Sequence, residues 1–179
     1  MENPFRLTGS REVYRSRLMR IREDYVVLPR GSSAMFNVAE IRSGSTVLAL
    51  DDTRHVHLIR EYKWGVNGES VEAISGGMEE GESPLECARR ELVEEGGLEA
   101  REWIEMGRLD PFTSHVYSPN YMFLARGLRP APKALEEGEV IHPFHTSLQN
   151  ALGMVMRSEI THAATAVLIL KTARLLGLG

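Results

Sequence analysis

The N-terminal quarter of the chain alternates between apolar and polar residues. Residues 13–28 follow this alternation around a polar break near residues 22–24, and the turn signal Pro29-Arg30-Gly31 leads into a further run, residues 34–41. Alternation with a period of two is typical of strands that have one apolar face. The pattern predicts an antiparallel β meander at the N-terminus.

Further along the chain, short apolar runs predict the strands of a main sheet. A hairpin is expected where Asp51-Asp52-Thr53 separates two of these runs. The expected strands are residues 46–50, 56–59, 71–74, 103–109, 121–125 and 140–144. Helical spacing over residues 148–156 and 163–176 predicts two closing helices, and residues 129–138, rich in proline and charge, predict a mobile surface loop.

One further helix is predicted by its capping residues. Ser83 precedes Pro84, and Glu86 follows Ser83 by three positions, which is a capping box with proline at the first helical position. The helix should continue through residue 95 and end at Gly96-Gly97, where a glycine can adopt the left-handed conformation.

This helix carries two contrasting faces. Leu85, Ala88 and Leu92 recur at spacings of three and four and form an apolar stripe that can pack on the sheet. Glutamates at positions 91, 94 and 95 gather on another face. An exposed acidic face is one interpretation of such a cluster. A magnesium or manganese site is the other, because hard divalent cations prefer clustered oxygen ligands.

Composition and charge narrow the class of protein. The 179 residues carry a net charge of −4, which gives no basic surface for nucleic acid. The longest purely apolar run, residues 166–170, is far too short to span a membrane. The first residues show no apolar core before a small-residue cleavage site, so we expect no export. The single cysteine, Cys87, fits a reducing compartment. We therefore expect a cytoplasmic protein.

The acidic helix lies within a recognisable signature. Gly76, five residues, Glu82, seven residues and then RELVEEGGL, residues 90–98, resemble the complete signature of the Nudix hydrolases. The resemblance implies an α/β Nudix fold, a mixed β-sheet sandwiched between helices, over residues 45–179, with residues 1–44 as the N-terminal β meander. It also implies a pyrophosphatase that cleaves a nucleoside diphosphate linked to another moiety.

Most of the chain is similar to the ADP-ribose pyrophosphatase-like subgroup. Residues 58–82, the strand MFLARGL and the ending SEITHAATAVLILKTA carry this similarity. By this resemblance Lys63 and Glu72 are candidate substrate-binding residues. Tyr62, whose ring can stack on a base or fill the core or an interface, and His115, which can contact substrate or be a surface histidine, are further candidates. The expected substrate is ADP-ribose-like first and GDP-mannose-like second. The base and sugar stay open, since Glu61-Tyr62-Lys63 stands where the subgroup has Gln-Tyr-Arg, and the subgroup's Ser-Pro-Gly is absent.

The resemblance also implies a set of metal ligands for Mg²⁺ or Mn²⁺. Glu91 and Glu95 are the expected principal ligands, with Glu94 as a further ligand and the Gly76 carbonyl completing the set. Glu82 either pairs with an arginine or assists a second metal ion.

Catalytic roles are assigned to three residues. Arg90 is expected to orient the glutamates through salt bridges, and Glu94 acts within the metal site. Glu139, in an acidic loop far from the signature, is the best match for the general base, with Glu136 and Glu137 as competitors.

Other features complete the expectations. Cys87 should be a small buried packing residue, because a thiolate is a poor ligand for magnesium. The six histidines show no metal-ligand spacing. The meander has an edge that a second subunit would cover, which predicts a homodimer. A non-catalytic Nudix domain that senses ADP-ribose or a related nucleotide is the alternative function, and an isomerase on the same fold is less favoured.

Overall fold

The computed structural model describes residues 2–133 and 140–178, which fold into two compact units. One unit combines the described part of Met1–Ser43 with Asp110–Pro119. The other comprises Gly44–Leu109 and the described part of Asn120–Gly179. Each unit contains its own sheet.

The first unit is a four-stranded sheet in the order β1-β2-β3-β9. Antiparallel pairing joins β1 (Arg6–Arg15), β2 (Met19–Val27) and β3 (Ser33–Ile41), and β9 (Val116–Tyr117) runs parallel to β3. The predicted meander is confirmed. The predicted break near residues 22–24 is wrong, because β2 continues through these residues and the actual turn lies between β1 and β2.

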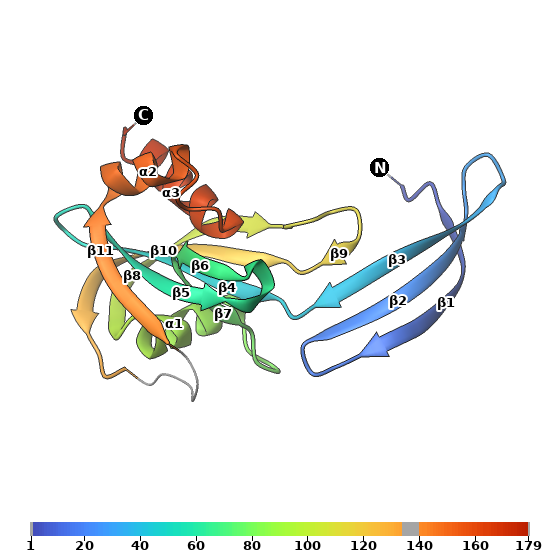
Figure 1. Cartoon of the computed structure of the whole chain (residues 1–179), viewed down its shortest axis with the longest axis horizontal. Coiled ribbons are helices and arrows are strands. Elements are labelled where there is room, and N and C mark those ends of the chain that lie inside the picture. Colours follow the sequence, from blue (N-terminus) through green and yellow to red (C-terminus); the bar gives the residue numbers. More distant parts are fainter. Residues whose placement is uncertain (1, 134–139, 179) are drawn as a thin grey trace. The chain divides into compact units, whose positions relative to one another are not determined.

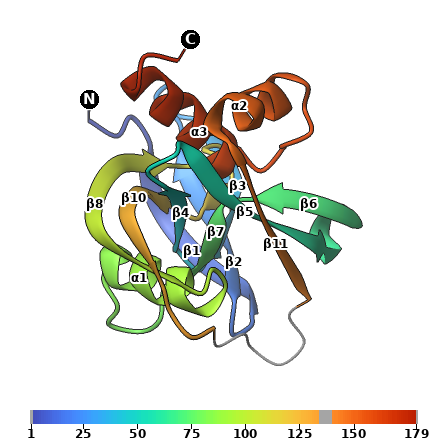
Figure 2. The ribbon, with the colours of Figure 1, turned by 90° about the vertical axis from the view of Figure 1, so that its left-hand side faces the viewer.

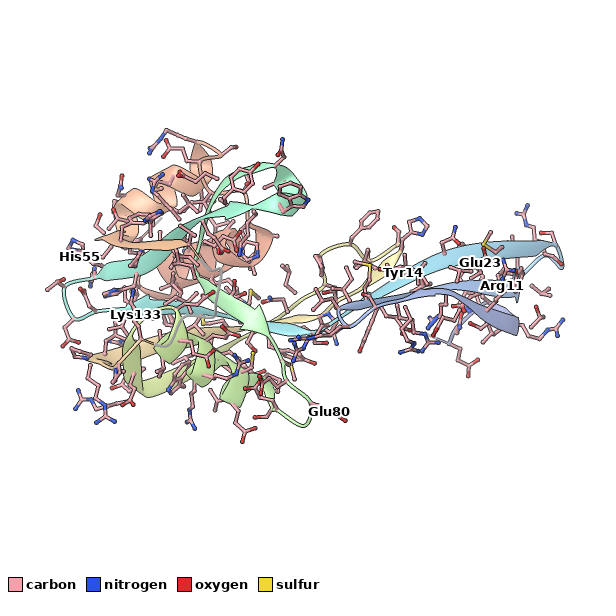
Figure 3. All side chains as sticks on the ribbon, turned by 60° about the horizontal axis from the view of Figure 1, so that its bottom comes forward. Arg11, Tyr14, Glu23, His55, Glu80 and Lys133 are labelled. Atoms are coloured by element: carbon pink, nitrogen blue, oxygen red, sulfur yellow. The ribbon has the colours of Figure 1, made fainter. Side chains whose placement is uncertain are left out.

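Cross-strand partners explain why charged residues do not interrupt β2. Glu23 accepts two hydrogen bonds from Arg11 on β1, at 3.1 and 2.8 Å, and Figure 3 shows both side chains on this sheet. The Asp24 carboxylate accepts a hydrogen bond from the Ser10 hydroxyl at 2.7 Å. Arg22 pairs with Glu40 on β3. Because both faces of the sheet are largely solvated, charged residues can occupy either face at little cost.

The second unit contains a seven-stranded mixed sheet. Its main order is β11-β5-β4-β10-β8, with β6 paired to β5 and β7 paired to β4. The strand bounds are β4 Gly44–Leu50, β5 His55–Lys63, β6 Gly68–Glu72, β7 Ile74–Gly77, β8 Leu98–Leu109, β10 Asn120–Pro130 and β11 Ile141–Ser147, and a short 3₁₀ turn, η1, covers Trp64–Val66. The hairpin predicted at residues 51–53 is confirmed between β4 and β5.

The sheet forks beyond this hairpin. Strands β4 and β5 pair only at Ala49↔His57 and Leu50↔Val56. Farther along, β6 continues the ladder with β5, and β7 continues it with β4. Ala73 is the single residue between β6 and β7, so the strand predicted over residues 71–74 is divided at this point. The fork brings Lys63, at the end of β5, near Glu95, which follows the helix packed on β4 and β7.

Helices cover both faces of this sheet. α1 (Pro84–Glu94) lies on one face, and α2 (Leu148–Met156) and α3 (Ala163–Leu175) lie on the other (Figures 1 and 2). The apolar stripe of α1 packs as predicted, since Ala88 and Leu92 are buried against Val47 and Phe123 of the sheet. A second cluster joins the opposite face of the sheet to α2 and α3. This is the predicted sandwich.

Several strands exceed their predicted lengths. β8 begins at Leu98 and β10 ends at Pro130, because these two strands pair with each other along almost their whole length. The predicted loop over residues 129–138 is therefore wrong for residues 129 and 130, and residues 134–139 lie outside the described part of the chain. Within the described residues, no helix is both long and apolar enough to span a membrane.

Candidate active site

The acidic face of α1 lies inward, against the fork of the sheet. The predicted capping box is present, with the Ser83 hydroxyl accepting from the Glu86 N–H and the Glu86 carboxylate accepting from the Ser83 N–H. The helix closes as predicted at Gly97, whose φ is +61°. Glu91 and Glu95, one turn apart, are only 8% and 5% exposed. An exposed acidic face is thus the wrong interpretation for these two residues.

Gly76 brings the backbone of β7 against Glu91. A Cβ atom placed on Gly76 would lie 1.8 Å from Glu91 Oε1 and 2.1 Å from Glu91 Cδ. No side chain fits in that space, so the glycine at this position is a steric requirement of the glutamate's location. The next strand residue back, Ser75, donates its N–H to Glu95 Oε2 at 3.1 Å. β7 therefore positions both carboxylates.

Arg90 lies among the carboxylates of the signature. Its guanidinium forms a bidentate pair with Glu82, at 2.9 Å from Nε and 3.0 Å from Nη2. Its Nη1 donates to Glu91 Oε1 at 2.7 Å and to Glu94 Oε2 at 2.9 Å, and Nη2 also donates to the Gly77 carbonyl at 3.0 Å. The predicted pairing of Glu82 with an arginine is present, and one cation holds three like charges together.

These contacts shift the protonation equilibria of the group. The hydrogen bond from Arg90 holds the pKa of Glu82 below its usual value, and the hydrogen bond to Glu82 raises the pKa of Arg90. Both groups stay ionised at neutral pH. Burial raises the pKa of the Cys87 thiol to about 11, and the side chain is fully buried as a packing residue, as predicted. Its S–H lies 3.6 Å from the Gly76 carbonyl.

A second group of charges lies on the other branch of the fork. The Lys63 ammonium, at the end of β5, pairs with Glu61. Burial alone would lower the pKa of Lys63, but this bond and the charges of Glu72 and Glu95 raise it overall. Glu72 is only 6% exposed, so it joins Glu91 and Glu95 as the three buried carboxylates among the described residues. Lys63, a predicted substrate-binding residue, thus interacts electrostatically with Glu95, a predicted metal ligand.

His162, which sequence reasoning did not single out, borders this group. Its Nδ1 lies 3.5 Å from Glu72 Oε2 and 2.8 Å from the Thr165 hydroxyl. That hydroxyl accepts the Ala73 N–H at 2.8 Å, across the point where β6 and β7 divide. Burial lowers the pKa of His162 despite the opposing effect of Glu72. A polar residue immediately before α3 was the available signal in the sequence.

The remaining predicted residues are placed differently. Tyr62 is exposed on β5, and its hydroxyl donates to Asn67 Oδ1 at 2.6 Å. His115 belongs to the first unit, where it lines a cavity of about 400 Å³ and its ring nitrogen Nδ1 lies 3.2 Å from the Asn37 carbonyl. Glu139, the predicted general base, and its competitors Glu136 and Glu137 lie outside the described residues.

The chemistry of the donors fits a hard divalent cation. Three glutamates within one turn of helix, with the backbone of Gly76 against Glu91, supply only oxygen ligands. As the side chains stand, no three carboxylate, imidazole or thiol groups of the described residues converge to hold an ion. Glu91 and Glu94 each direct one oxygen to Arg90, and each carboxylate has two oxygens that can accept or ligate.

Comparisons with known proteins point to one family. The NUDIX domain model matches residues 41–166. The chain is 26% identical to an ADP-ribose pyrophosphatase of Bacillus subtilis (strain 168), over 88% of this chain and 86% of the relative. It is 27% identical to an ADP-ribose pyrophosphatase of Mycobacterium tuberculosis, over 90% and 80%, and 24% identical to a methanol dehydrogenase activator of Bacillus methanolicus, over 88% and 86%.

A solved structure agrees with the fold. The crystal structure of an ADP compounds hydrolase superposes with a TM-score of 0.84 at 22% identity, covering 99% of this chain and 98% of that one. The signature geometry, the family model and this architecture confirm the predicted membership: the chain belongs to the Nudix family.

Proposed function

We propose that the protein is a divalent-metal-dependent hydrolase of the diphosphate linkage in a nucleoside diphosphate-sugar. ADP-ribose-like compounds are the first candidates and GDP-mannose-like sugars the second, and the products are a nucleoside monophosphate and a sugar phosphate. The observation that carries this proposal is the burial of Glu91 and Glu95 against the backbone of β7. Two relatives named ADP-ribose pyrophosphatases support the choice of substrate.

Glu91, Glu95, Glu94 and the Gly76 carbonyl are the groups that would hold Mg²⁺ or Mn²⁺. A bound divalent cation neutralises the diphosphate oxygens and lowers the barrier to attack by water. The residues fit because all of these groups present oxygen atoms, and a bound cation would compensate part of the buried negative charge of Glu91 and Glu95. Arg90 supplies part of that compensation and keeps the glutamate side chains in one orientation.

The chain's own groups complete the proposed chemistry. Lys63 places a positive charge beside Glu95, where it can pair with a phosphate oxygen of the substrate. Tyr62, exposed on the same strand, offers an aromatic face for a base. Glu139 is the proposed general base that removes a proton from the attacking water, and Glu139→Gln should reduce turnover strongly while leaving metal affinity nearly unchanged.

A panel of nucleotide sugars tests this function. Purified protein is incubated with Mg²⁺ and ADP-ribose, GDP-mannose or UDP-glucose, and the nucleoside monophosphate released is quantified by chromatography. We expect AMP from ADP-ribose at the highest kcat/KM. Release of no monophosphate from any compound, with Mg²⁺ or with Mn²⁺, would reject the proposal.

A regulatory role is the second candidate, because one relative carries the name of an enzyme activator. In that role the chain would bind a nucleotide sugar without cleaving it. Calorimetry on the same panel separates the two functions. Tight binding of a compound that remains intact supports the sensor, whereas turnover supports the hydrolase.

We also propose a homodimer formed through the first unit. Antiparallel register places several exposed apolar side chains on one face of the β1-β2-β3 sheet: Tyr14, Met19, Tyr25, Met35 and Ile41. Figure 3 labels Tyr14 on this sheet. Val26 is the only buried hydrophobic side chain among the described residues of the unit. A sheet with so small a core gains stability if a second copy covers it.

Light scattering tests the oligomeric state. Wild-type protein should have twice the mass of the chain, and Tyr14→Asp with Met35→Asp should shift it toward the monomer. A single monomeric species over a broad range of wild-type concentration would overturn the proposal.

A further inference from the structure

A basic cavity of about 290 Å³ lies between α1 and the edge strand β8 of the second unit. We call it the arginine pocket. Its lining residues are Arg89, Val93, Glu99, Ala100, Arg101, Trp103 and Arg129. Three guanidinium groups against one carboxylate give the lining a formal charge of +2, in a chain whose net charge is −4. Such a local excess of positive charge attracts anions.

The arginine pocket is separate from the glutamate site. Arg89 precedes Glu91 by two positions on α1, which turns its side chain by about 200° around the helix axis. It is exposed, whereas Glu91 is buried against β7. The guanidinium of Arg89 lies 5.9 Å from the centre of the Trp103 ring. The attraction between a cation and an aromatic face holds this guanidinium beside the ring.

The indole of Trp103 is held in place. Its Nε1 donates to the Ala100 carbonyl at 3.2 Å, and its ring meets Phe123 edge to face with centroids 6.3 Å apart. The ring therefore forms a fixed wall of the arginine pocket rather than a mobile surface side chain. A fixed aromatic wall beside a guanidinium is suited to a ligand that carries both a charge and a planar ring.

A glycine in the neighbouring strand makes room for Arg101. Gly127 has φ of +64°, and a Cβ on it would lie 3.0 Å from Arg101 Nε and 3.3 Å from Arg101 Cβ. The Arg101 side chain thus crosses β10 at a position where any larger residue would crowd it. This close approach restricts the conformations open to the Arg101 side chain.

The arginines differ in how their charges are compensated. Arg129 pairs with Glu99, its cross-strand neighbour, with 2.7 Å between Nε and Oε2. Neither Arg89 nor Arg101 has a carboxylate within salt-bridge distance among the described residues. Two guanidinium groups without a carboxylate at salt-bridge distance among the described residues therefore face one cavity, and Glu86 attracts the charge of Arg89 from farther away.

From this arrangement we propose that the arginine pocket binds a phosphate group, and that it binds a nucleoside monophosphate more tightly than inorganic phosphate. Guanidinium groups match the geometry of phosphate oxygens through paired N–H donors. Trp103 supplies the surface on which the base of a nucleotide can rest, so phosphate alone uses only part of the cavity. The proposal does not depend on hydrolysis by the glutamate site.

Indole N–H signals in an NMR titration test this proposal. The chain has two tryptophans, Trp64 and Trp103, whose signals are assigned with Trp64→Phe. The titrations use EDTA, so that no divalent ion recruits ligand to the glutamate site. AMP, inorganic phosphate and adenosine are added separately, which distinguishes a nucleotide, a free phosphate and a base without charge.

We expect AMP to shift the Trp103 signal with saturation in the millimolar range or below, phosphate to shift it more weakly, and adenosine to leave it unchanged. Arg89→Gln and Arg101→Gln should each weaken AMP binding about tenfold. Arg174→Gln, an exposed arginine on α3, is the matched control and should bind as wild type does. No shift of Trp103 with AMP, or equal weakening by Arg174→Gln, would overturn the proposal.

Discussion

Gly76→Ala is the substitution that tests how strongly activity depends on the position of the Glu91 carboxylate. The added Cβ would lie 1.8 Å from Glu91 Oε1, whereas real Cβ contacts are essentially never shorter than 3.0 Å. The carboxylate must therefore move by at least the difference, 1.2 Å. The group that yields is the far end of a side chain, because the backbone of β7 is fixed by its pairing with β4.

The size of the effect follows from this displacement. Moving the carboxylate disturbs its 2.7 Å hydrogen bond from Arg90, which should cost about 1–3 kcal/mol in the free energy of unfolding. Metal sites tolerate ligand displacements of only about 0.2 Å. A misplacement of about 1 Å at a reacting centre commonly reduces turnover by about a hundredfold. A loss of this size in the free energy of unfolding leaves a domain of ordinary stability folded, so turnover should fall while the protein stays folded.

The assay is AMP release from ADP-ribose as a function of Mg²⁺ concentration, with urea unfolding of the same preparations. Gly68→Ala on β6 is the matched control, because its Cβ would meet only an ordinary contact of 3.8 Å. We expect Gly76→Ala to need more Mg²⁺ and to turn over about a hundredfold more slowly, while Gly68→Ala resembles wild type. Unchanged turnover and Mg²⁺ dependence in Gly76→Ala would refute the reasoning.

Three further predictions concern single side chains. Arg90→Gln leaves three facing carboxylates without their cation. The free energy of unfolding, measured in urea at pH 7, should therefore fall by about 2–3 kcal/mol, and a fall of less than about 0.5 kcal/mol would contradict this. Burial and the nearby histidines lower the pKa of His57 from 6.5, so the unfolded state binds the proton more readily and stability should fall as the pH decreases below about 6.5. His57→Gln should flatten that decrease in pH-dependent unfolding curves, and an unaltered slope would count against it. The pKa of Cys87 is about 11, against an ordinary value of 9.0. Cys87 in the folded protein should therefore react with iodoacetamide at pH 7.5 about a hundredfold more slowly than in the unfolded chain. Equal rates would contradict the raised pKa.

The elements with strong local signals could be predicted from the sequence. α1 was located by its capping box and closing glycine, since both act within a few residues of the helix ends. The β4–β5 hairpin was located for the same reason, because Asp51 Oδ1 accepts from the N–H groups of Thr53 and His55. The glutamate cluster followed from helical periodicity together with the signature.

Features set by contacts between distant segments could not be predicted. β2 passes through its charged residues because partners on β1 and β3 compensate them, and those partners lie more than ten positions away. Asp110–Pro119 joins the first unit through pairing with β3, which no local pattern indicates. The proximity of Lys63 to Glu95 arises from the fork of the sheet, and the fork depends on register.

The central claim is that buried glutamates on α1 hold a divalent cation for cleavage of a diphosphate. Calorimetric titration of Mg²⁺ into the protein, in the presence of a non-hydrolysable ADP-ribose analogue, tests it most directly. Wild type should bind Mg²⁺, Glu91→Gln and Glu95→Gln should lose that binding, and Glu86→Gln, at the helix N-terminus, should retain it. Equal uptake of Mg²⁺ by wild type and by both glutamine variants would contradict the account.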